Sequence, residues 1–503
     1  MTRDPTSIGA GLDPVRPARA IRRNERIHVV GAAGAGASAA ALLARAAGTV
    51  VDGCDPGLPS PYSPALEAAG IPVAAAHDPR HVTTDPPPDR LAVTKALTAI
   101  DPDNAELRAA RDRGIPVEPW QQVVADAATG RDLIAIAGTH GKSTTAGWLV
   151  HVLVEAGLDP AAFVGALLPS SITGGVPATA RSGSGRPFVV EADEYAGNFD
   201  AYVPSLAVLT SIEWDHPDVF ADVAAVREAF TEWLRRMPAD GVIVANVDDE
   251  GVATVVNEVN RDHPMTVVDI ALTDTEGPRS EIAVSGRISA ADRAFTTLEL
   301  RGLRPDGQPL VAQLRTAGRH NAANALCAAV AASRIGVPPE TIVRGLASFP
   351  GVGRRLERIG EAAGVVVYDD YGHHPTAIRE TITAVRQREP DRRVWAVYEP
   401  LTYHRTAALL EDFAAALGTA DAVAVADIWA GRDPDTTVAS AAGLAAAVAG
   451  LRPEMTVEAP GAVGATAAWL ARNVRAGDAV LVMGGGQSYQ IASGLLRRLE
   501  EMR

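Results

Sequence analysis

The chain has little cysteine and no long apolar run. Its 503 residues include only two cysteines, Cys54 and Cys327, which lie far apart in the sequence. Such cysteine use is typical of a reducing compartment and argues against a disulfide-stabilised secreted fold. No stretch reaches the ~18 apolar residues of a membrane span, and the first residues lack the apolar core of a signal peptide. We therefore expect a cytoplasmic protein without a membrane partner.

Positive charge is scarce relative to negative charge. The chain carries 46 Lys and Arg residues against 61 Asp and Glu residues, which gives a net charge of −15. A nucleic-acid partner is not expected at this balance, because such partners are bound mainly through their phosphates. Anionic substrates must instead be held by local positive sites. The apolar content of 47% is that of a globular protein.

The length of the chain fits about three domains of ~150 residues each. We expect residues 1–23, which are rich in Pro and Arg, to form a flexible tail. The domains are then expected at 24–129, 130–350 and 351–503. Apolar strand-like runs recur in each of them with helical stretches between, which predicts an α/β fold with mostly parallel sheets.

A glycine-rich turn with one lysine follows a buried strand in the second domain. Residues 138–145 read Gly-Thr-His-Gly-Lys-Ser-Thr-Thr, between the apolar run 133–137 and a stretch with helical spacing. Unpaired backbone N–H groups and the helix dipole attract phosphate at such a turn. Lys142 would reach the β- and γ-phosphates, and Ser143 can ligate Mg²⁺. This turn predicts a nucleoside triphosphate site; the alternative is an ordinary turn with a surface lysine.

A second glycine-rich turn opens the first domain. The apolar run 27–30 leads into Gly31-Ala-Ala-Gly-Ala-Gly36, an Ala/Leu-rich helix and a second strand at 49–51. A β-α-β opening of this kind suits a diphosphate. Ala33 stands where a dinucleotide fingerprint has glycine. The glycines can alternatively serve only the close packing of helix and strand.

Acidic clusters follow two strands of the second domain. The apolar run 188–190 leads into Glu-Ala-Asp-Glu at 191–194, and the run 206–210 leads toward Glu-Trp-Asp-His at 213–216. Ligands of doubly wound sheets lie at the carboxyl ends of the strands. We therefore expect the lysine turn and both clusters to converge on one Mg²⁺–phosphate site.

Later segments complete the expected fold. Alternation of apolar and polar residues over 263–315 predicts antiparallel strands at the edge of the second domain. A long helix follows Gly318 and places Asn321 and Asn324 one turn apart on one face, unless Asn321 only caps the helix. In the third domain, four apolar strands each end in polar residues: 365–368, 394–397, 422–425 and 479–483.

In this order, the motifs resemble those of the Mur ligase family, the ATP-dependent amide-forming enzymes of peptidoglycan synthesis. The resemblance covers about residues 27–490 and includes Arg354-Arg-Leu-Glu357 and Asp-Asp-Tyr-Gly-His-His-Pro-Thr at 369–376. The last motif is typical of the alanine-adding branch and its tripeptide-recycling relative. The resemblance implies Rossmann-like first and third domains around a central ATPase-like domain with a phosphate loop.

The family resemblance also implies the substrates and cofactors. The first domain would bind UDP-N-acetylmuramate, the second ATP with Mg²⁺, and the third a small amino acid, L-alanine, with contacts to ATP. The two substrates would be joined through an acyl phosphate. A monomer or weak homodimer is expected.

Roles follow at the positions that match the family motifs. The catalytic residues would be Lys142, His216, Arg355 and His373. Contacts to ATP would come from Gly138, Thr139, His140, Gly141, Lys142, Ser143, Thr144, Asn321, Asn324, Arg355 and Asp370. Metal ligands would be Ser143, Glu191 and His216. Substrate contacts would come from Gly31, Gly34, Gly36, Asp55, His77, Tyr371, Tyr403 and Arg405.

The chain departs from the family pattern at several of its sites. Leu401 stands where the alanine-adding enzymes have His, and Glu399 where they have Gln. Ser211 replaces an Asn and Gln487 an Asp. The segment 227–233 has no Lys of the kind that is carbamylated in many relatives. The residue at 401 puts the identity of the added amino acid in question.

Other functions stay open at this point. The same UDP-sugar could receive a peptide, glycine or serine, and the pocket around Leu401 decides this. A folylpolyglutamate-type ligase would not need the glycine-rich first domain. An inactive nucleotide-binding relative is compatible with the departures at 211, 401 and 487. An NAD-dependent dehydrogenase rests only on the first glycine turn, where Ala33 is unfavourable.

Overall fold

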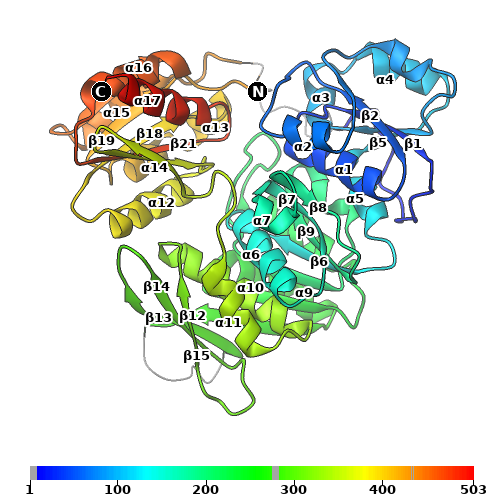
Figure 1. Ribbon diagram of the computed structural model, residues 1–503, viewed down its shortest axis with the longest axis horizontal. Helices are drawn as coiled ribbons and strands as arrows, with labels where there is room; N and C mark the ends of the chain where they lie inside the picture. Colours follow the sequence, from blue (N-terminus) through cyan, green and yellow to red (C-terminus); the bar gives the residue numbers. More distant parts are fainter. Residues whose placement is uncertain (1–7, 275–281, 432, 434, 503) are drawn as a thin grey trace.

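The computed structural model describes residues 8–274, 282–431, 433 and 435–502, which form three α/β domains. The N-terminal domain (blue in Figure 1) and the C-terminal domain (yellow to red) lie on either side, and the central domain extends beneath them. A mixed α/β fold with three domains and mostly parallel sheets confirms the predicted fold class.

The N-terminal domain is a five-stranded parallel sheet in the order β3-β2-β1-β4-β5. Its strands are β1 (Arg26–Val30), β2 (Val50–Cys54), β3 (Val73–Ala74), β4 (Arg90–Val93) and β5 (Val117–Pro119). Its helices are α1 (Ala35–Ala46), α2 (Ser63–Ala68), η2 (Pro79–Val82), α3 (Lys95–Ile100), α4 (Ala105–Asp112) and α5 (Trp120–Ala127). The glycine-rich turn 31–34 joins β1 to α1, as the sequence predicts.

The segment 8–23 lies against this domain, which differs from the expected flexible tail. Asp13 and Val117 exchange two hydrogen bonds of 2.8 Å, through the backbone N–H and carboxylate of Asp13. The Arg16 guanidinium lies 2.6 Å from Glu118 and 2.8 Å from Asp126, whose carboxylates are almost fully buried. Docking by backbone and charge leaves no apolar periodicity, which is why the sequence pattern missed it. Residues 1–7 of the predicted tail lie outside the described residues.

The central domain is built on a ten-stranded sheet in the order β15-β14-β13-β12-β11-β10-β6-β9-β7-β8. Its strands are β6 (Asp132–Ala137), β7 (Ala161–Leu168), β8 (Ala178–Arg181), β9 (Pro187–Ala192), β10 (Leu206–Leu209), β11 (Val242–Asn246), β12 (Thr266–Leu272), β13 (Val284–Ala291), β14 (Thr296–Arg301) and β15 (Leu310–Leu314). Its helices are α6 (Lys142–Glu155), α7 (Ser170–Thr173), η3 (Tyr195–Ala201), α8 (Val223–Leu234), α9 (Glu250–Asp262), α10 (Arg319–Arg334) and α11 (Pro339–Ser348).

The predicted antiparallel edge over 263–315 is only partly correct. The strand β12 pairs parallel with β11, and β13 pairs parallel with β12; only β14 and β15 add antiparallel pairs. Helix α9 carries the chain back across the sheet between β11 and β12, which makes that pair parallel. Part of the predicted edge, residues 275–281, lies outside the described residues.

The C-terminal domain has a six-stranded sheet in the order β16-β17-β21-β18-β19-β20, parallel except for β16. Its strands are β16 (Glu357–Ala362), β17 (Val365–Asp370), β18 (Arg393–Glu399), β19 (Ala422–Ala426), β20 (Thr456–Gly461) and β21 (Asp478–Gly484). Its helices are α12 (Pro375–Arg388), α13 (Tyr403–Ala408), α14 (Leu410–Leu417), α15 (Ala441–Leu451), α16 (Val463–Asn473) and α17 (Tyr489–Glu501).

The apolar cores divide the molecule unequally. One buried cluster runs from the N-terminal sheet and α1 into the central domain, where Phe163 and Phe188 belong to it. The C-terminal domain has its own clusters on the two faces of its sheet. Among the described residues, no helix combines the length and the apolarity that crossing a bilayer requires.

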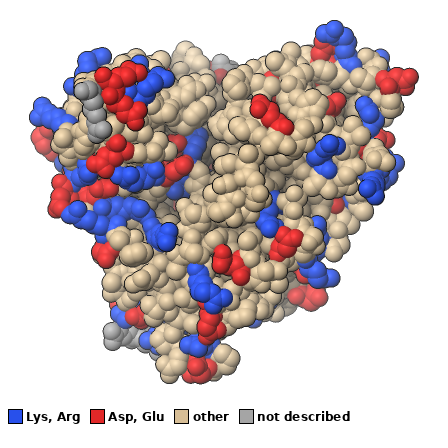
Figure 2. All heavy atoms as spheres, viewed as in Figure 1, with Lys and Arg blue, Asp and Glu red and all other residues tan. Residues whose placement is uncertain are grey.

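Charged side chains are mixed rather than segregated on the face shown in Figure 2. Over the C-terminal domain, Arg side chains lie beside Asp and Glu side chains. The ion pairs of this domain include Arg386–Asp421 at 2.9 Å and Arg392–Glu361 at 3.1 Å. The negative net charge is therefore not gathered in one patch on this face.

Candidate active site

A cavity of about 630 Å³ opens where the three domains meet. This volume is in the range of small-molecule sites. The central domain contributes the turn after β6 and the acidic segments after β9 and β10, and the C-terminal domain contributes residues after β17 and β18. The N-terminal domain contributes Ala96 and Ile100 of α3. The sequence-based expectation that strand ends converge on one site therefore agrees with the cavity.

The lysine turn between β6 and α6 is held by its glycines and by Ser211. Gly138 has φ +139°, and a Cβ there would lie 2.2 Å from Thr210 Oγ1. Gly141 has φ +80°, and its Cβ would lie 2.3 Å from Asn324 Oδ1. Ser211 accepts hydrogen bonds from the backbone N–H groups of Thr139 and His140, at 2.8 and 3.0 Å. The serine that departs from the family pattern thus fixes the turn.

Lys142 lies at the centre of this turn. Its ammonium donates to the carbonyl oxygen of Gly138 at 2.5 Å and lies 3.0 Å from Glu194 and 3.4 Å from Asp193. Burial alone would lower the pKa of Lys142, but the surrounding carboxylates, Glu194 foremost, raise it above its usual value. A fully charged ammonium is therefore available to the phosphates of a nucleotide.

Ser143 and Glu191 provide two oxygen donors beside the turn. The Ser143 hydroxyl donates to Glu191 Oε1 at 3.0 Å, and Glu191 Oε2 accepts a hydrogen bond of 2.6 Å from the backbone N–H of Gly165. Arg355 of the C-terminal domain donates to the same hydroxyl at 3.0 Å. A hydroxyl and a carboxylate are donors of the type that Mg²⁺ prefers. These residues therefore fit a Mg²⁺–phosphate site.

His216 lies beside two carboxylates other than the predicted Glu191. Among the described residues, the potential cation ligands grouped with His216 are Asp193 and Glu194, not Glu191. The His216 Nε2 atom is 4.0 Å from Glu194, and Nδ1 accepts a hydrogen bond of 2.9 Å from Arg405. The three predicted metal ligands therefore fall into two groups: Ser143 lies with Glu191, and His216 lies with Asp193 and Glu194.

Asp215 ties the C-terminal domain to this edge of the sheet. It lies 2.7 Å from Arg405 and 3.9 Å from His373 Nε2, and all three side chains are largely buried. Burial would raise the pKa of Asp215, but the charge of Arg405 holds it well below its usual value. Arg405, predicted to contact substrate, lines the cavity, and within the part of the chain that the structure describes its buried Nη1 has no hydrogen-bond partner.

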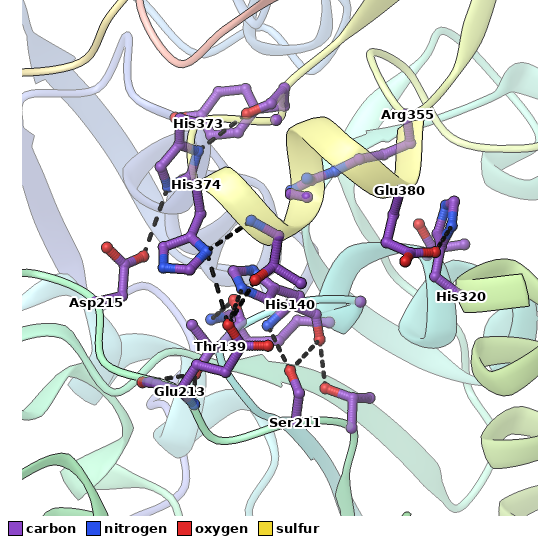
Figure 3. Close-up of a pocket in the computed structure, with 18 of the residues that line it drawn as sticks. Thr139, His140, Ser211, Glu213, Asp215, His320, Arg355, His373, His374 and Glu380 are labelled. Atoms are coloured by element: carbon purple, nitrogen blue, oxygen red, sulfur yellow. Dashed lines mark hydrogen bonds and ion pairs between the residues drawn. The ribbon is translucent and has the colours of Figure 1, made fainter. Parts of the chain in front are cut away.

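The two adjacent histidines have different environments. His374 accepts from the backbone N–H of Thr376 through Nδ1, and its Nε2 lies 3.2 Å from the carbonyl oxygen of Trp214. Both of its nitrogens are therefore used to cap α12 and to hold the domains together. His373 Nδ1 lies 2.9 Å from the carbonyl oxygen of Tyr371, which leaves Nε2 to accept a proton. Figure 3 shows Asp215 facing His373, with Glu213 close to His374 and His140.

Burial and nearby positive charge keep both histidines neutral. Burial, assisted by Arg405, holds the pKa of His373 well below its usual value. Burial, assisted by His140, lowers the pKa of His374 to about 4. Glu213 accepts a hydrogen bond of 2.7 Å from Thr376, and despite its burial the nearby imidazole of His140, with Nε2 at 3.7 Å, lowers the pKa of Glu213 to about 2.

The asparagine pair of α10 lies inside the cavity. Asn321 donates through Nδ2 to the carbonyl oxygen of Ala317 at 2.7 Å, and Asn324 touches the lysine turn at Gly141. The N-cap residue of α10 is Gly318, which precedes the helix, so Asn321 does not cap it. The position agrees with a contact to the nucleotide, which stays a prediction.

Asp370 shapes the entry of Arg355 into the site. Its two carboxylate oxygens each accept a 2.7 Å hydrogen bond, from the backbone N–H groups of Leu356 and Gly372. The Arg355 guanidinium lies 5.1 Å from the centre of the Tyr371 ring. Asp370 and Tyr371 both line the cavity. Asp370 therefore acts on this loop through its backbone.

The predicted substrate residues of the N-terminal domain lie outside the cavity. Asp55 accepts from the backbone N–H groups of Ala33 and Gly57, which accounts for both of its oxygens. His77 Nδ1 lies 3.1 Å from Cys54 Sγ. A Cβ on Gly36 would lie 2.1 Å from the Trp120 ring, so packing accounts for that glycine. Contacts of this region with a nucleotide sugar remain predictions.

The first glycine turn itself keeps an open approach. Gly31 has φ +84°, a conformation that favours glycine, and a Cβ there would lie 2.3 Å from Thr94 Cγ2. Gly34 is the N-cap residue of α1, and among the described residues no side chain caps this helix. A helix N-terminus without a side-chain cap leaves backbone N–H groups available to an anion.

Of the two residues predicted to contact the amino acid, Arg405 lines the cavity and Tyr403 does not. Leu401 and Arg405 line the cavity, whereas Tyr403, the first residue of α13, is not among the described lining residues. Leu401 bridges to Trp429, which also lines the cavity. The pocket therefore has an apolar wall at the position where the alanine-adding enzymes have histidine.

Sequence reasoning assigned no role to Asp193, Glu194 and Asp215. The sequence places them in the acidic clusters after β9 and β10, but the pattern does not indicate which carboxylate pairs with which positively charged side chain. Lys142 pairs with the first two and Arg405 with the third. Such pairs depend on the packing of distant segments, for which the local pattern carries no signal.

Models of three protein-family domains match the chain in order. Residues 26–131 match the Mur ligase family catalytic domain, 136–332 the Mur ligase middle domain, and 354–486 the Mur ligase glutamate ligase domain. A UDP-N-acetylmuramate–L-alanine ligase of Frankia casuarinae is 38% identical over 82% of this chain and 85% of its own. The enzyme of that name from Kineococcus radiotolerans is 36% identical over 98% of this chain and 99% of its own.

The fold has a solved counterpart. The crystal structure of a UDP-N-acetylmuramate–alanine ligase from Thermotoga maritima superposes with a TM-score of 0.77, covering 95% of this chain and all of that one (100%), at 22% identity. At this identity the superposition shows the fold alone. Together with the matched domains and the more similar relatives, it leads to one assignment. The chain belongs to the Mur ligase family.

Proposed function

We propose that the chain joins the carboxylate of UDP-N-acetylmuramate to the amine of L-alanine, converting ATP to ADP and phosphate. The relatives that carry this name are 36–38% identical over most of the chain. We further propose that residues 24–129 bind the UDP-sugar, 130–350 bind ATP and 351–503 bind the amino acid. A cytoplasmic location belongs to this proposal, because both nucleotides are cytoplasmic metabolites.

One observation carries the proposal more than any other. The cavity brings Lys142 of the lysine turn together with Arg355 and Arg405 of the C-terminal domain, and Arg355 donates a hydrogen bond to Ser143 beside it. A site that only bound a nucleotide would need the turn alone. Cations from two domains around one cavity suit a reaction that transfers a phosphoryl group and then accepts a second substrate.

The first step activates the carboxylate. A carboxylate oxygen of the sugar's lactyl group attacks the γ-phosphorus, the bond to ADP breaks, and an acyl phosphate forms. Lys142 and Arg355 offset the charge that builds on the transferring group. Ser143 and Glu191 would hold Mg²⁺, which supplies Lewis-acid stabilisation of the phosphate oxygens when bound.

The second step forms the amide. The amine of the amino acid attacks the carbonyl carbon, the carbon–oxygen bond to phosphate breaks, and phosphate leaves. His373 Nε2 takes the proton of the amine, and Asp215 at 3.9 Å offsets the charge that the imidazole then gains. The C-terminal domain covers the site and keeps water from the acyl phosphate.

The test is phosphate release from ATP in the presence of UDP-N-acetylmuramate and a panel of acceptors. We expect release that requires both substrates, with L-alanine preferred over glycine and serine, and a product of the corresponding mass. Arg355→Ala should lower the rate by ~10²–10³-fold, as expected for one charge-stabilising group. Turnover only with a preformed peptide would replace the acceptor in this proposal, and ATP binding without any turnover would refute the ligase function.

A further inference from the structure

A second cluster of potential metal ligands lies in the N-terminal domain, away from the cavity. One ligand atom from each of four side chains lies within 4.8 Å of the others: His28, Cys54, His81 and Glu106. These residues come from β1, β2, η2 and α4, and none of them lines the cavity. In Figure 1, β1, β2 and α4 belong to the blue domain.

The distances within the cluster suit a small metal ion. Glu106 Oε1 lies 2.8 Å from His28 Nε2 and 2.9 Å from His81 Nδ1. Glu106 Oε2 lies 3.3 Å from Cys54 Sγ. Ligand atoms around a tetrahedral Zn²⁺ are about 3.3–3.8 Å apart, given bonds of about 2.0–2.3 Å. The four side chains would therefore need to separate by only about an ångström to admit the ion.

His28 is oriented as a metal-binding histidine is. Its ring is almost fully buried, and its Nδ1 lies 2.7 Å from the carboxylate of Asp52 on β2. Its Nε2 points at the cluster and is buried without a hydrogen bond of good geometry, although Glu106 is near. A carboxylate that holds one ring nitrogen while the other faces a metal is a usual outer-shell arrangement.

The donor set favours one kind of metal. A thiolate with two imidazoles and a carboxylate suits Zn²⁺, whereas Mg²⁺ prefers oxygen donors only. Cys54 and Glu106 are buried, and the half-buried His81 offers a way in from solvent. The other cysteine, Cys327, lies in the core of the central domain, so these two thiols are in different domains.

We propose that His28, Cys54, His81 and Glu106 form a Zn²⁺ site that stabilises the N-terminal domain beside its glycine-rich turn. The carbonyl oxygen of Cys54 accepts hydrogen bonds from the backbone N–H groups of Gly31 and Ala32, at 2.9 and 3.2 Å. An ion bound to Cys54 therefore fixes the turn through one residue. The inference does not depend on the proposed reaction.

The zinc content of the full chain tests this inference. The protein is purified, loaded with Zn²⁺, dialysed against a weak chelator and analysed for metal. We expect stoichiometric zinc in the wild type and in Cys327→Ser, the matched control at the other buried thiol. Cys54→Ser and His81→Asn should each weaken the affinity at least ~100-fold, because even the loss of an outer-shell partner costs 10–100-fold.

Cobalt gives a second reading of the same ligands. Co²⁺ in the site should show thiolate-to-metal charge-transfer absorption in the wild type and in Cys327→Ser, and none in Cys54→Ser. If Cys54→Ser fails to fold, His81→Asn is used instead, because a partly exposed ring can be replaced with less damage to the fold. Its metal content is then compared with that of the wild type, after ATP binding with unchanged affinity has shown that the variant is folded. Zinc that is absent from the wild type, or retained equally by the variants, overturns the proposal.

Discussion

The two interfaces of the central domain are built from different materials. Toward the N-terminal domain the contact is mainly apolar, although a few hydrogen bonds cross it: one core runs through both domains, and the Trp120 ring meets Phe163 edge to face with centroids 5.2 Å apart. Toward the C-terminal domain the contacts around the cavity are charged or polar, as in Arg405–Asp215 at 2.7 Å and Arg355–Ser143 at 3.0 Å.

This difference suggests which domain moves. Separation of an apolar interface exposes its area to water at a cost of about 25 cal/mol per Å². Polar partners can be exchanged for water or for ligand groups at a much smaller net cost. We therefore expect the N-terminal and central domains to act as one body and the C-terminal domain to open and close on it. The polar interface then carries the chemistry, and the apolar one carries stability.

The two lysines of the chain allow the sharpest test of this division, because Lys142 lines the cavity and Lys95 lies between the N-terminal and central domains. Lys142 belongs to the catalytic site, whereas Lys95 donates to the carbonyl oxygen of Ala196 between the N-terminal and central domains, at 2.7 Å. Lys142→Ala should lower amide formation by at least ~10³-fold through the loss of charge at the phosphoryl group. The measurement is the steady-state rate at saturating ATP.

The matched variant is Lys95→Ala, which should keep kcat within a few-fold of the wild type. A Lys142→Ala enzyme with more than a tenth of the wild-type rate would remove the lysine turn from the chemistry. A comparable loss in Lys95→Ala would show that the apolar interface also takes part in the reaction.

Removal of an anchor from the apolar interface should cost stability. Trp120→Ala deletes a large ring that fills the space above Gly36 and meets Phe163. We expect a loss of about 3 kcal/mol in the free energy of unfolding, the lower end for aromatic truncations because the ring is half-buried. Urea denaturation followed by circular dichroism measures it, with Trp429→Ala at the partly exposed cavity wall as control. Equal losses in both variants would contradict the division between the interfaces.

A change in the docked segment 8–23 tests how much the ion pairs of Arg16 contribute to holding the segment against the N-terminal domain. Arg16→Ala removes hydrogen bonds to the buried carboxylates of Glu118 and Asp126, although Arg90 still pairs with both. The expected loss is about 1.5–3 kcal/mol, as for hydrogen bonds to charged groups. Limited proteolysis near residue 16 should accelerate in the variant and not in Arg80→Ala, whose guanidinium is exposed. An unchanged cleavage rate would mean that the backbone contacts of Asp13 suffice.

The sequence predicted the local features of the site well and the contacts between distant segments poorly. The turn at Lys142, the strands that lead to it and the helix with Asn321 follow from apolar periodicity and glycine placement. The pairing of His216 with Asp193 and Glu194 does not, because it depends on how β9 and β10 flank β6 on its two sides. The docking of 8–23 and the cluster at Cys54 were missed for the same reason.

A change at Leu401 tests the amino-acid pocket within the polar interface. Leu401→His restores the residue of the alanine-adding enzymes at a position that lines the cavity. A new hydrogen bond to a charged group of the substrate contributes about 1.5 kcal/mol, which corresponds to a ~10-fold lower KM for L-alanine. Kinetics with L-alanine and with a peptide acceptor measure it. If KM stays the same, or the peptide exceeds every single amino acid, the pocket has been assigned wrongly.

The smallest expected effect lies just behind that pocket, at Glu399 in the last position of β18. Its side chain is buried, and its Oε2 has no hydrogen-bond partner among the described residues. Burial raises the pKa of its carboxyl to about 7, although the backbone N–H groups of Ser488 and Gln487 lower it. The folded protein therefore holds this proton more tightly than the unfolded chain, whose carboxyl titrates near the usual 4.5. Stability from this group is present below about pH 4.5 and is lost as the pH rises toward 7.

Glu399→Gln removes this ionisation and keeps the shape of the side chain. The variant should match the wild type in Tm at about pH 5 and exceed it above pH 7, where the wild type must bury a charged carboxylate. Differential scanning calorimetry across this range measures the difference, with the exposed Glu454→Gln as a control that should show none. A Tm difference that is constant with pH would mean that Glu399 is already ionised in the folded protein at about pH 5. In that case the polar character of the C-terminal interface extends to the strand behind the pocket.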